Sequence, residues 1–303
     1  MSERARVSVV LANWNGVRFL GGAIESVVRQ TFGDWVLIIV DTGSTDGSRA
    51  ILNGWAAADR RIRPILMPRR LNCPAALNIG LSQAHGRFVA RIESDDLWLP
   101  NRLEEQIAFL DRPSQARVGV CGADVLLIDE SGRALGTKRY PRSHEACLRA
   151  MWYRNPFCHS SVLVRREVFQ TCGGYDEASI PCEDLALWFR VGRVWELRNL
   201  PRPLASYRVW PGSLTSRKLR SLVWRSYRLR REAVRNLGYR RPPLAALYSA
   251  SSLGANLLPP KLVRRLFQLL LSVLGEPDAS AGLAPGLGAN RRIGWPRFRG
   301  RSA

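Results

Sequence analysis

Short apolar segments alternate with amphipathic ones through the N-terminal third of the chain, and this alternation restricts the folds it can adopt. The apolar segments are rich in β-branched residues, as buried strands are, and they cover residues 7–11, 35–40, 62–67 and 88–92. Between them the spacing of apolar residues predicts three helices. Such alternation predicts an α/β fold in which a mostly parallel sheet is flanked by helices on both faces.

Polar turns follow three of the predicted strands. They are the turn Asn13–Gly16, the loop that starts at Asp41, and the sequence Glu93-Ser94-Asp95-Asp96. Ligands of parallel sheets bind beyond the carboxyl ends of the strands, so these turns are expected to line a site. The loop after Asp41 has neither the lysine of a P-loop nor the G-x-G-x-x-G pattern of dinucleotide-binding folds.

The acidic cluster is the most unusual of these turns. Three carboxylates so close together repel one another unless a positive charge lies between them, and a divalent cation is the simplest candidate. The alternative is a solvated acidic turn ahead of the helix predicted over residues 100–110.

Beyond residue 110 the pattern is less regular. Strands are predicted over residues 123–129 and 161–164, and a helix is predicted to begin at Glu183-Asp184. Acids in a first helical turn are stabilised by the exposed N–H groups there, so this pair alone is weak support for chemistry.

The positive charge is concentrated near the C-terminus. The chain has 303 residues and a net charge of +21. From Arg217 onward there are 18 Lys and Arg against 3 acids, which leaves +6 for residues 1–216. The six cysteines form no CxxC pair and match no standard zinc spacing, and no signal peptide is recognisable, so we expect reduced thiols in a cytoplasmic protein.

Taken together, the motifs resemble those of the family 2 glycosyltransferases, a group of inverting enzymes with the GT-A fold. The resemblance covers about residues 5–215 in the family's order and spacing, and it implies a catalytic domain over residues 1–216. The matching segments are VSVVLANWNG at Val7–Gly16, AIESVVRQTF at Ala23–Phe32, LIIVDTGSTDGS at Leu37–Ser48, AALNIG at Ala75–Gly80, GRFVARIESDD at Gly86–Asp96, PNRL at Pro100–Leu103, NPFCHSS at Asn155–Ser161, GGYD at Gly173–Asp176 and EDLALWFR at Glu183–Arg190.

The resemblance implies roles for two groups of acids. Glu93, Asp95 and Asp96 stand at the family's D-x-D motif and would hold Mg²⁺ or Mn²⁺ against the diphosphate of a nucleotide sugar. Asp184 matches the aspartate that takes the proton from the acceptor hydroxyl, with Glu183 beside it in the catalytic pair.

The resemblance also implies where the nucleotide sugar binds. His159 matches a histidine near the acceptor, and a purely structural histidine is an equal alternative. The remaining residues expected to surround the donor are Leu11, Asn13, Asn15, Asp41, Thr42, Ser44 and Asp95.

Two positions depart from the family's motifs. Thr42 replaces the second aspartate of an Asp-Asp pair, which weakens the inference of a UDP donor and leaves GDP- and dTDP-linked sugars open. Glu93 replaces the first aspartate of D-x-D, so Asp95 and Asp96 are the firmer metal candidates. A catalytically impaired sugar-nucleotide-binding or scaffold protein is therefore an alternative. A nucleotidyltransferase is a weaker one, since the turn after the first strand is no Gly-rich phosphate loop.

The C-terminal part predicts a basic helical extension over residues 217–274, in which arginines alternate with Leu, Val, Trp and Tyr. Its most apolar stretch is about 15 residues long, short of the ~20 that span a bilayer. Such an extension could bind an anionic membrane surface or pack on the catalytic domain, and the sequence supports both equally. Residues 275–303 are predicted to be disordered, and no nucleic-acid module is present.

The sequence thus predicts a cytoplasmic inverting glycosyltransferase of the hexosyltransferase type, peripheral on the inner face of the plasma membrane. Its expected substrates are a UDP-, GDP- or dTDP-linked sugar and a saccharide or lipid-linked acceptor, in the synthesis of a cell-surface polysaccharide or glycolipid.

Overall fold

A computed structural model describes residues 5–213, 218–246 and 248 of the chain. The basic segment 261–274 and the predicted disordered segment 275–303 lie outside the described residues. None of the helices within those ranges combines the length and apolar character needed to cross a bilayer.

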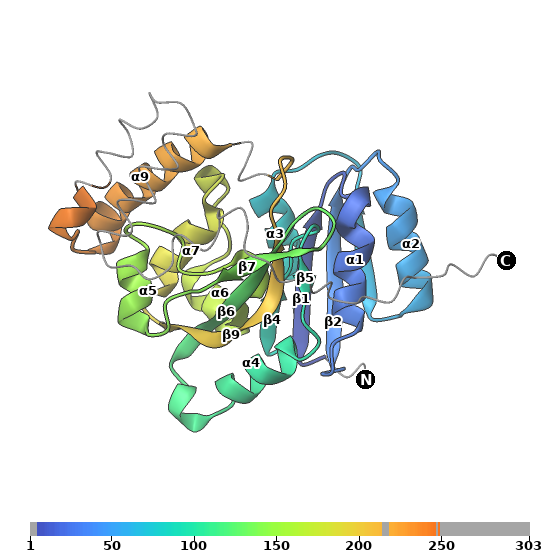
Figure 1. Ribbon diagram of the computed structural model, residues 1–303, viewed down its shortest axis with the longest axis horizontal. Helices are drawn as coiled ribbons and strands as arrows, with labels where there is room; N and C mark the ends of the chain where they lie inside the picture. The colour runs from blue at the N-terminus through green and yellow to red at the C-terminus, as the bar shows by residue number, and fades with distance from the viewer. Residues whose placement is uncertain (1–4, 214–217, 247, 249–303) are drawn as a thin grey trace.

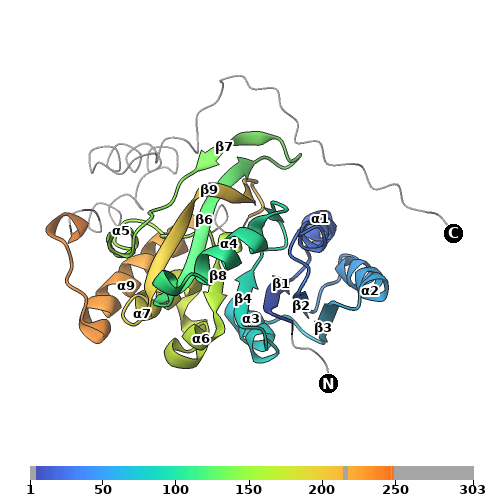
Figure 2. The same cartoon turned by 90° about the horizontal axis from the view of Figure 1, so that it is seen from below.

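One sheet of nine strands organises the described chain, in the order β3-β2-β1-β4-β8-β6-β9-β5 with β7 paired to β6 (Figures 1 and 2). From β3 to β4 all neighbours are parallel, whereas β8 lies antiparallel between β4 and β6. The strands are β1 (Val7–Asn13), β2 (Trp35–Thr42), β3 (Ile62–Met67), β4 (Phe88–Arg91), β5 (Leu97–Trp98), β6 (Val118–Ile128), β7 (Ala134–Lys138), β8 (Leu163–Arg165) and β9 (Glu196–Arg208).

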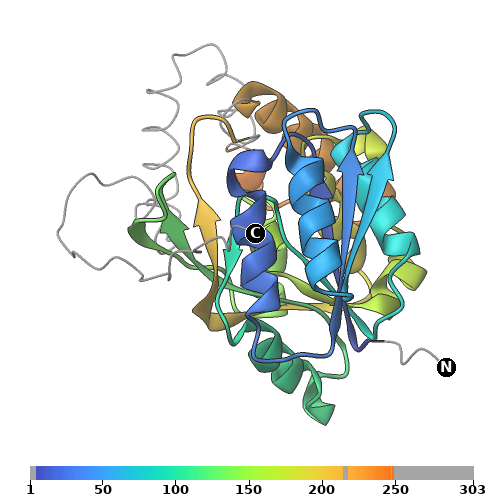
Figure 3. The ribbon, with the colours of Figure 1, turned by 90° about the vertical axis from the view of Figure 1, so that its right-hand side faces the viewer.

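Helices cover both faces of the sheet, which confirms the predicted α/β fold. Figure 3 shows α1 and α2 side by side on one face of the N-terminal strands. The helices are α1 (Val17–Val28), α2 (Ser48–Ala58), α3 (Cys73–Ser82), α4 (Arg102–Leu110), α5 (His144–Ala150), α6 (Arg166–Cys172), α7 (Glu183–Val191) and α9 (Leu219–Leu237), with short 3-10 turns η1 (Pro113–Gln115), η2 (His159–Ser161) and η3 (Glu177–Ser179).

The alternation of side chains along β1 builds the two cores. Successive strand residues point to opposite faces, so Val9 and Leu11 pack with the buried side of α1, while Val10 packs with Leu77 of α3. The second core continues through α6 and α7 to Leu229 of α9. Since both faces of β1 are buried, packing fixes the position of its carboxyl end, where the turn Asn13–Gly16 begins.

The C-terminal half of the sheet departs from the simple parallel pattern. Strand β9 runs parallel to β6 and shifts register around Asp124, and it contains Pro201 and Pro203. It ends beside the acidic turn that follows β4, because Arg208 N donates a 2.9 Å hydrogen bond to Asp96. The late strand thus completes a site begun by the N-terminal strands.

Helix α9 packs on α7 (Figure 1). Its inner face is buried, and Arg230 Nε donates to the carbonyl of Met151 at 3.0 Å. The side chains of that inner face are Val223, Ser226, Leu229, Arg230 and Ala233. The start of the predicted extension is therefore part of the same packed structure as the helix that carries Glu183 and Asp184.

Candidate functional site

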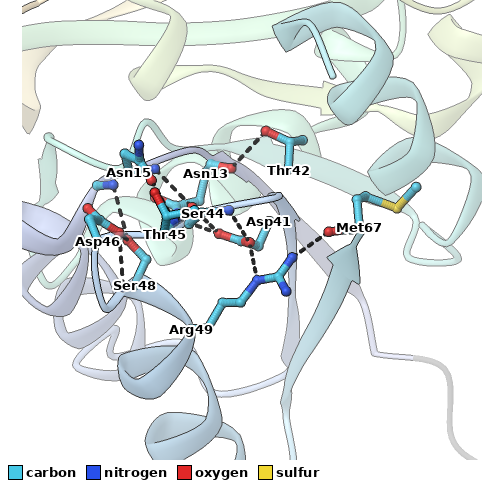
Figure 4. A network of polar contacts seen from close by, with 11 residues as sticks. Asn13, Asn15, Asp41, Thr42, Ser44, Thr45, Asp46, Ser48, Arg49 and Met67 are labelled. Atoms are coloured by element: carbon cyan, nitrogen blue, oxygen red, sulfur yellow. Dashed lines mark hydrogen bonds and ion pairs between the residues drawn. The ribbon is translucent and has the colours of Figure 1, made fainter. Parts of the chain in front are cut away.

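A network of hydrogen bonds joins the two loops that follow β1 and β2 (Figure 4). Asp41 lies at its centre and accepts hydrogen bonds from Asn13 Nδ2 at 2.8 Å, from the Ser44 hydroxyl and N–H, and from Arg49 Nε at 3.0 Å. Burial alone would raise the pKa of Asp41, but the hydrogen bonds from Ser44 and Asn13 outweigh it and lower the pKa. The ionised carboxylate therefore organises the two loops.

The same network orders the start of α1. Val17 N donates to Asp46 Oδ2 at 2.9 Å, and Gly16 N donates to Ser48 Oγ at 3.1 Å. Gly43 adopts a left-handed conformation, and a Cβ there would lie 2.9 Å from the carbonyl carbon of Arg69. A side chain at this position would therefore strain the backbone and collide with the chain after β3.

Most of the residues expected around the nucleotide are buried, either within this network or, for Leu11, in the apolar core. Their side chains contact other parts of the protein; Thr42 Oγ1, for example, donates a hydrogen bond to the carbonyl of Asn13 at 3.3 Å. The buried ones are Leu11, Asn13, Asp41, Thr42 and Ser44. Asn15 is exposed, but its Oδ1 already accepts from Thr45 N at 2.8 Å.

An aromatic side chain that the sequence analysis did not select is exposed at this edge. Trp14 follows β1 and is 41% exposed, and the Arg70 guanidinium lies 3.5 Å from the centroid of its ring. Exposed aromatic rings next to polar strand ends are suited to stacking on a base.

The three acids after β4 have different surroundings. Glu93 Oε2 forms a 2.9 Å ion pair with Arg91 Nη2, and Glu93 Oε1 lies 3.1 Å from His159 Nδ1. Burial opposes the ionisation of Glu93, but the charge of Arg91 and the contact with His159 outweigh it and lower the pKa to about 2. Both oxygens of Glu93 thus have protein partners.

Asp96 is buried and Asp95 faces the cavity. Asp96 accepts hydrogen bonds from the Ser160 hydroxyl and from Arg208 N, whereas Asp95 Oδ2 accepts from Trp210 Nε1 at 2.8 Å. Burial, and then the negative charge of Asp95, raise the pKa of Asp96 well above its usual range. Burial also raises the pKa of Asp95. Among the described hydrogen bonds none reaches Asp95 Oδ1.

The surroundings of these acids show whether they could bind the predicted divalent cation. Within the described ranges no three His, Cys, Asp or Glu side chains converge to hold an ion by themselves. Mg²⁺ commonly takes only one or two carboxylates from the protein and the rest from phosphates and water. The open oxygen of Asp95, which lines the cavity, fits that kind of binding.

Glu183 and Asp184 begin α7 and line the same cavity as Asp95. Asn155 Nδ2 donates a hydrogen bond to Asp184 Oδ2, and Leu185 N donates to Asp184 Oδ1 at 2.7 Å. Glu183 is 7% exposed and its Oε2 atom has no hydrogen-bond partner among the described residues. Burial, and then the charge of Asp184, raise the pKa of Glu183 to about 7.

The cavity has a volume of about 480 Å³ and brings the predicted acids together. Its lining includes all three acids of the 93–96 turn, His159, and both acids of α7. The C-terminal part of the chain also contributes to the lining, including Leu222, Val223 and Tyr248. The nucleotide-side residues Leu11, Asn13, Asn15, Asp41, Thr42 and Ser44 are not in this lining.

Several residues of the site were not predicted. Asn155 orients Asp184, and Trp210 and the backbone of Arg208 hold the acidic turn. The only sequence signal for Asn155 was its place in the NPFCHSS segment. Arg208 and Trp210 carried no signal, since they meet the acids only through the pairing of β9.

Comparison with known proteins identifies the family of the chain. The family described as Glycosyl transferase family 2 matches residues 8–173. EpsE of Bacillus subtilis, named as a glycosyltransferase, is 35% identical over 193 residues, which are 63% of this chain and 68% of EpsE. The amylovoran biosynthesis glycosyltransferase AmsE of Erwinia amylovora is 28% identical over 271 residues, 86% of this chain and 97% of AmsE.

A solved structure supports the fold. The mannosyltransferase PcManGT of Pyrobaculum calidifontis, in complex with GDP-Man and Mn²⁺, superposes with a TM-score of 0.60 at 17% sequence identity. The match covers 92% of this chain and 77% of PcManGT. It confirms the GT-A-type architecture predicted from the motifs.

Proposed function

Because the chain belongs to glycosyl transferase family 2, we propose that it transfers a sugar from a nucleotide-sugar donor to a saccharide or lipid-linked acceptor, with inversion at the sugar carbon. The observation that carries this proposal is the cavity shared by Asp95 and Asp184. A carboxylate suited to a cation and a carboxylate suited to a proton thus line the same cavity. The name of the relative AmsE supports polysaccharide synthesis as the process.

Asp184 is the base in this proposal. Its carboxylate takes the proton of the acceptor hydroxyl as that oxygen forms a bond to the anomeric carbon. The bond from that carbon to the diphosphate oxygen breaks at the same time, and the diphosphate leaves with the electron pair. A single displacement of this kind inverts the carbon. Asn155 holds Asp184 in one orientation through its hydrogen bond to Oδ2.

Asp95 is the residue proposed to hold Mg²⁺ or Mn²⁺. A bound cation would neutralise charge that develops on the leaving diphosphate. The PcManGT complex contains Mn²⁺ together with GDP-Man, which supports a cation in proteins of this fold. The exposed ring of Trp14 is proposed to stack on the base, and Asp41 to hold the loop beneath it.

Helix α9 is proposed to bring the enzyme to an anionic membrane surface. Its sequence contains six arginines and one glutamate, and its outer face exposes Arg228, Arg231 and Arg235 together with Trp224, which is 52% exposed. Basic side chains near an indole favour the interfacial region of anionic bilayers. Packing on α7 and membrane contact are compatible, because they use opposite faces of the helix.

The function is tested first by donor binding. The melting temperature is measured with UDP, GDP and dTDP, with and without Mn²⁺, since a ligand that binds the folded state raises it. A shift with one nucleotide that requires Mn²⁺ is the expected result, followed by release of that nucleotide from its sugar conjugate and an inverted anomer in the product. No shift with any nucleotide would contradict the donor site and favour a scaffold protein.

A further inference from the structure

Four side chains form a continuous chain of contacts beside the cavity. Arg91 pairs with Glu93 at 2.9 Å, Glu93 Oε1 lies 3.1 Å from His159 Nδ1, and His159 Nε2 lies 2.8 Å from the hydroxyl of Tyr175. They come from the end of β4, the acidic turn, η2 and the loop before η3. Glu93 thus connects segments that are far apart in the sequence.

Both ends of this chain are anchored. Arg91 is 2% exposed, and its Nη1 donates to the carbonyl of Val10 in β1 at 3.1 Å. Tyr175 is 6% exposed, and its backbone N–H and carbonyl both bond to the Asn78 side chain of α3 at 2.8 Å. The carboxylate of Glu93 is therefore fixed at both oxygens by groups that the core holds in place.

Glu93 and Asp96 differ from Asp95 in how many of their carboxylate oxygens already have protein partners. Glu93 neutralises the buried cation Arg91, and its departure toward a metal ion would leave that cation without its nearest counter-ion, which is unfavourable in a buried environment. Asp96 has both oxygens occupied and is 1% exposed. Among these three acids, only Asp95 presents an oxygen that has neither a described hydrogen bond from another residue nor an ion pair, since Glu93 Oε2 is paired with Arg91.

We propose that Glu93, although it stands in the D-x-D motif, is a positioning residue that orders the acidic turn and fixes His159, and that it is not a ligand of the metal ion proposed at Asp95. This inference rests on the proposed donor site. Both ring nitrogens of His159 have protein partners, so the imidazole links the acidic turn to Tyr175. The extra methylene of glutamate relative to aspartate is what lets Glu93 span Arg91 and His159.

The variant Glu93→Asp distinguishes positioning from direct metal binding. It restores the acid usual in the D-x-D motif, so a direct ligand would keep its Mn²⁺ affinity or improve it. A positioning residue would lose its contact with His159, and Mn²⁺ binding would weaken about tenfold, as expected for partners of a ligand. Mn²⁺ binding is measured by electron paramagnetic resonance of the free ion with UDP, and separately with GDP, present.

Coupling between variants gives a second readout. Glu93→Gln, His159→Gln and the double variant should weaken Mn²⁺ binding to a similar extent, because they break the same chain of contacts. Asp95→Asn should weaken it further in any of these backgrounds. Loss of Mn²⁺ binding in Glu93→Gln with unchanged binding in His159→Gln would overturn the proposal.

The wild-type protein provides a test that needs no folded Glu93 variant. The chain has three histidines, so the imidazole ¹⁵N resonances of His159 can be assigned with His159→Gln and referenced to His85 and His144. These resonances should stay in place when Mg²⁺ and nucleotide are added, since Glu93 keeps its contact. A large change would show that Glu93 leaves His159 for the cation, and would overturn the proposal. Absence of any Mn²⁺–nucleotide binding by wild type would instead overturn the donor site, and with it the role given to Asp95.

Discussion

Asp184 has the most direct chemical task proposed for any residue of this chain. Replacing it with asparagine keeps the shape and one of the two oxygens that accept hydrogen bonds from Asn155 Nδ2 and Leu185 N, but removes the proton acceptor. We expect Asp184→Asn to lower the transfer rate by about 10²–10⁴-fold, with the nucleotide-induced shift of the melting temperature unchanged. Asp34→Asn, at an exposed aspartate outside the cavity, should keep the wild-type rate. A rate for Asp184→Asn within tenfold of wild type would refute its role as the base.

Glu183 should make stability depend on pH. Its pKa is about 7 in the folded chain, above the value near 4.3 of an unfolded glutamate. Glu183 therefore contributes most to the stability of the folded chain below about pH 4.3. This contribution to stability is lost as the pH rises through about 7. Glu183→Gln cannot ionise, so its stability relative to wild type should increase between pH 5 and 8, by up to about 3 kcal/mol.

The measurement for Glu183 is thermal unfolding of wild type and variant at several pH values. Glu177→Gln, at an exposed glutamate outside the cavity lining, serves as the matched control and should follow wild type. A constant difference between Glu183→Gln and wild type across this pH range would show that Glu183 does not titrate in it.

The acids of the 93–96 turn show which features of single residues can be predicted from the sequence. Their clustering predicts a charged site after β4, and the cavity contains all three. Their individual surroundings depend on His159, Ser160 and Trp210, which lie more than sixty residues later in the chain. Local spacing carries no information about such partners, so the sequence could group the acids but could not assign their separate contacts.

Among the elements, the packing of α9 on α7 can be tested by a substitution that creates a cavity in their contact. Leu229 is 5% exposed and belongs to the core shared with α7. Leu229→Ala should lower the free energy of unfolding by about 2–5 kcal/mol. Val234→Ala on the same helix removes a side chain that is 38% exposed and should change stability by less than about 0.5 kcal/mol.

Urea unfolding followed by tryptophan fluorescence measures both variants. If α9 folded apart from the catalytic domain, Leu229→Ala would leave the main transition in place, contrary to this expectation. A lowered midpoint with one transition would instead place α9 in the same cooperative unit as α7.

The elements also differ in how well their sequences identify them. Strands β1 and β2 are continuous apolar segments with both faces buried, so the apolar pattern suffices. Strand β9 contains two prolines, which cannot donate to a ladder and so argue against a strand. The structure accommodates them where the register with β6 shifts near Asp124. That irregularity depends on the partner strand, so the sequence of β9 alone does not predict it.

At the scale of the whole molecule, the cavity joins parts that the sequence presents separately. The N-terminal sheet contributes the acidic turn to its lining, and the segments in and after α9 contribute Val223 and Tyr248. The sequence predicts a catalytic domain ending near residue 216 and a basic extension after it. That residues of the extension line the cavity follows only from the packing of α9 on α7.

The proposed membrane contact predicts binding that depends on the charge of α9. In the full chain, reversing the exposed Arg228, Arg231 and Arg235 to glutamate should weaken binding to phosphatidylglycerol-containing vesicles by about 100-fold or more, since each basic residue near an anionic surface contributes about 1 kcal/mol. Co-sedimentation at rising salt measures this, and wild-type binding should fall as screening increases. A matched control reverses Arg60, Arg63 and Arg117, which are exposed elsewhere, so the net charge changes equally. If both triple variants lose binding to the same extent, the attraction comes from overall charge, and α9 is no specific membrane contact. If only the α9 variant loses binding, the exposed face of α9 is the membrane contact.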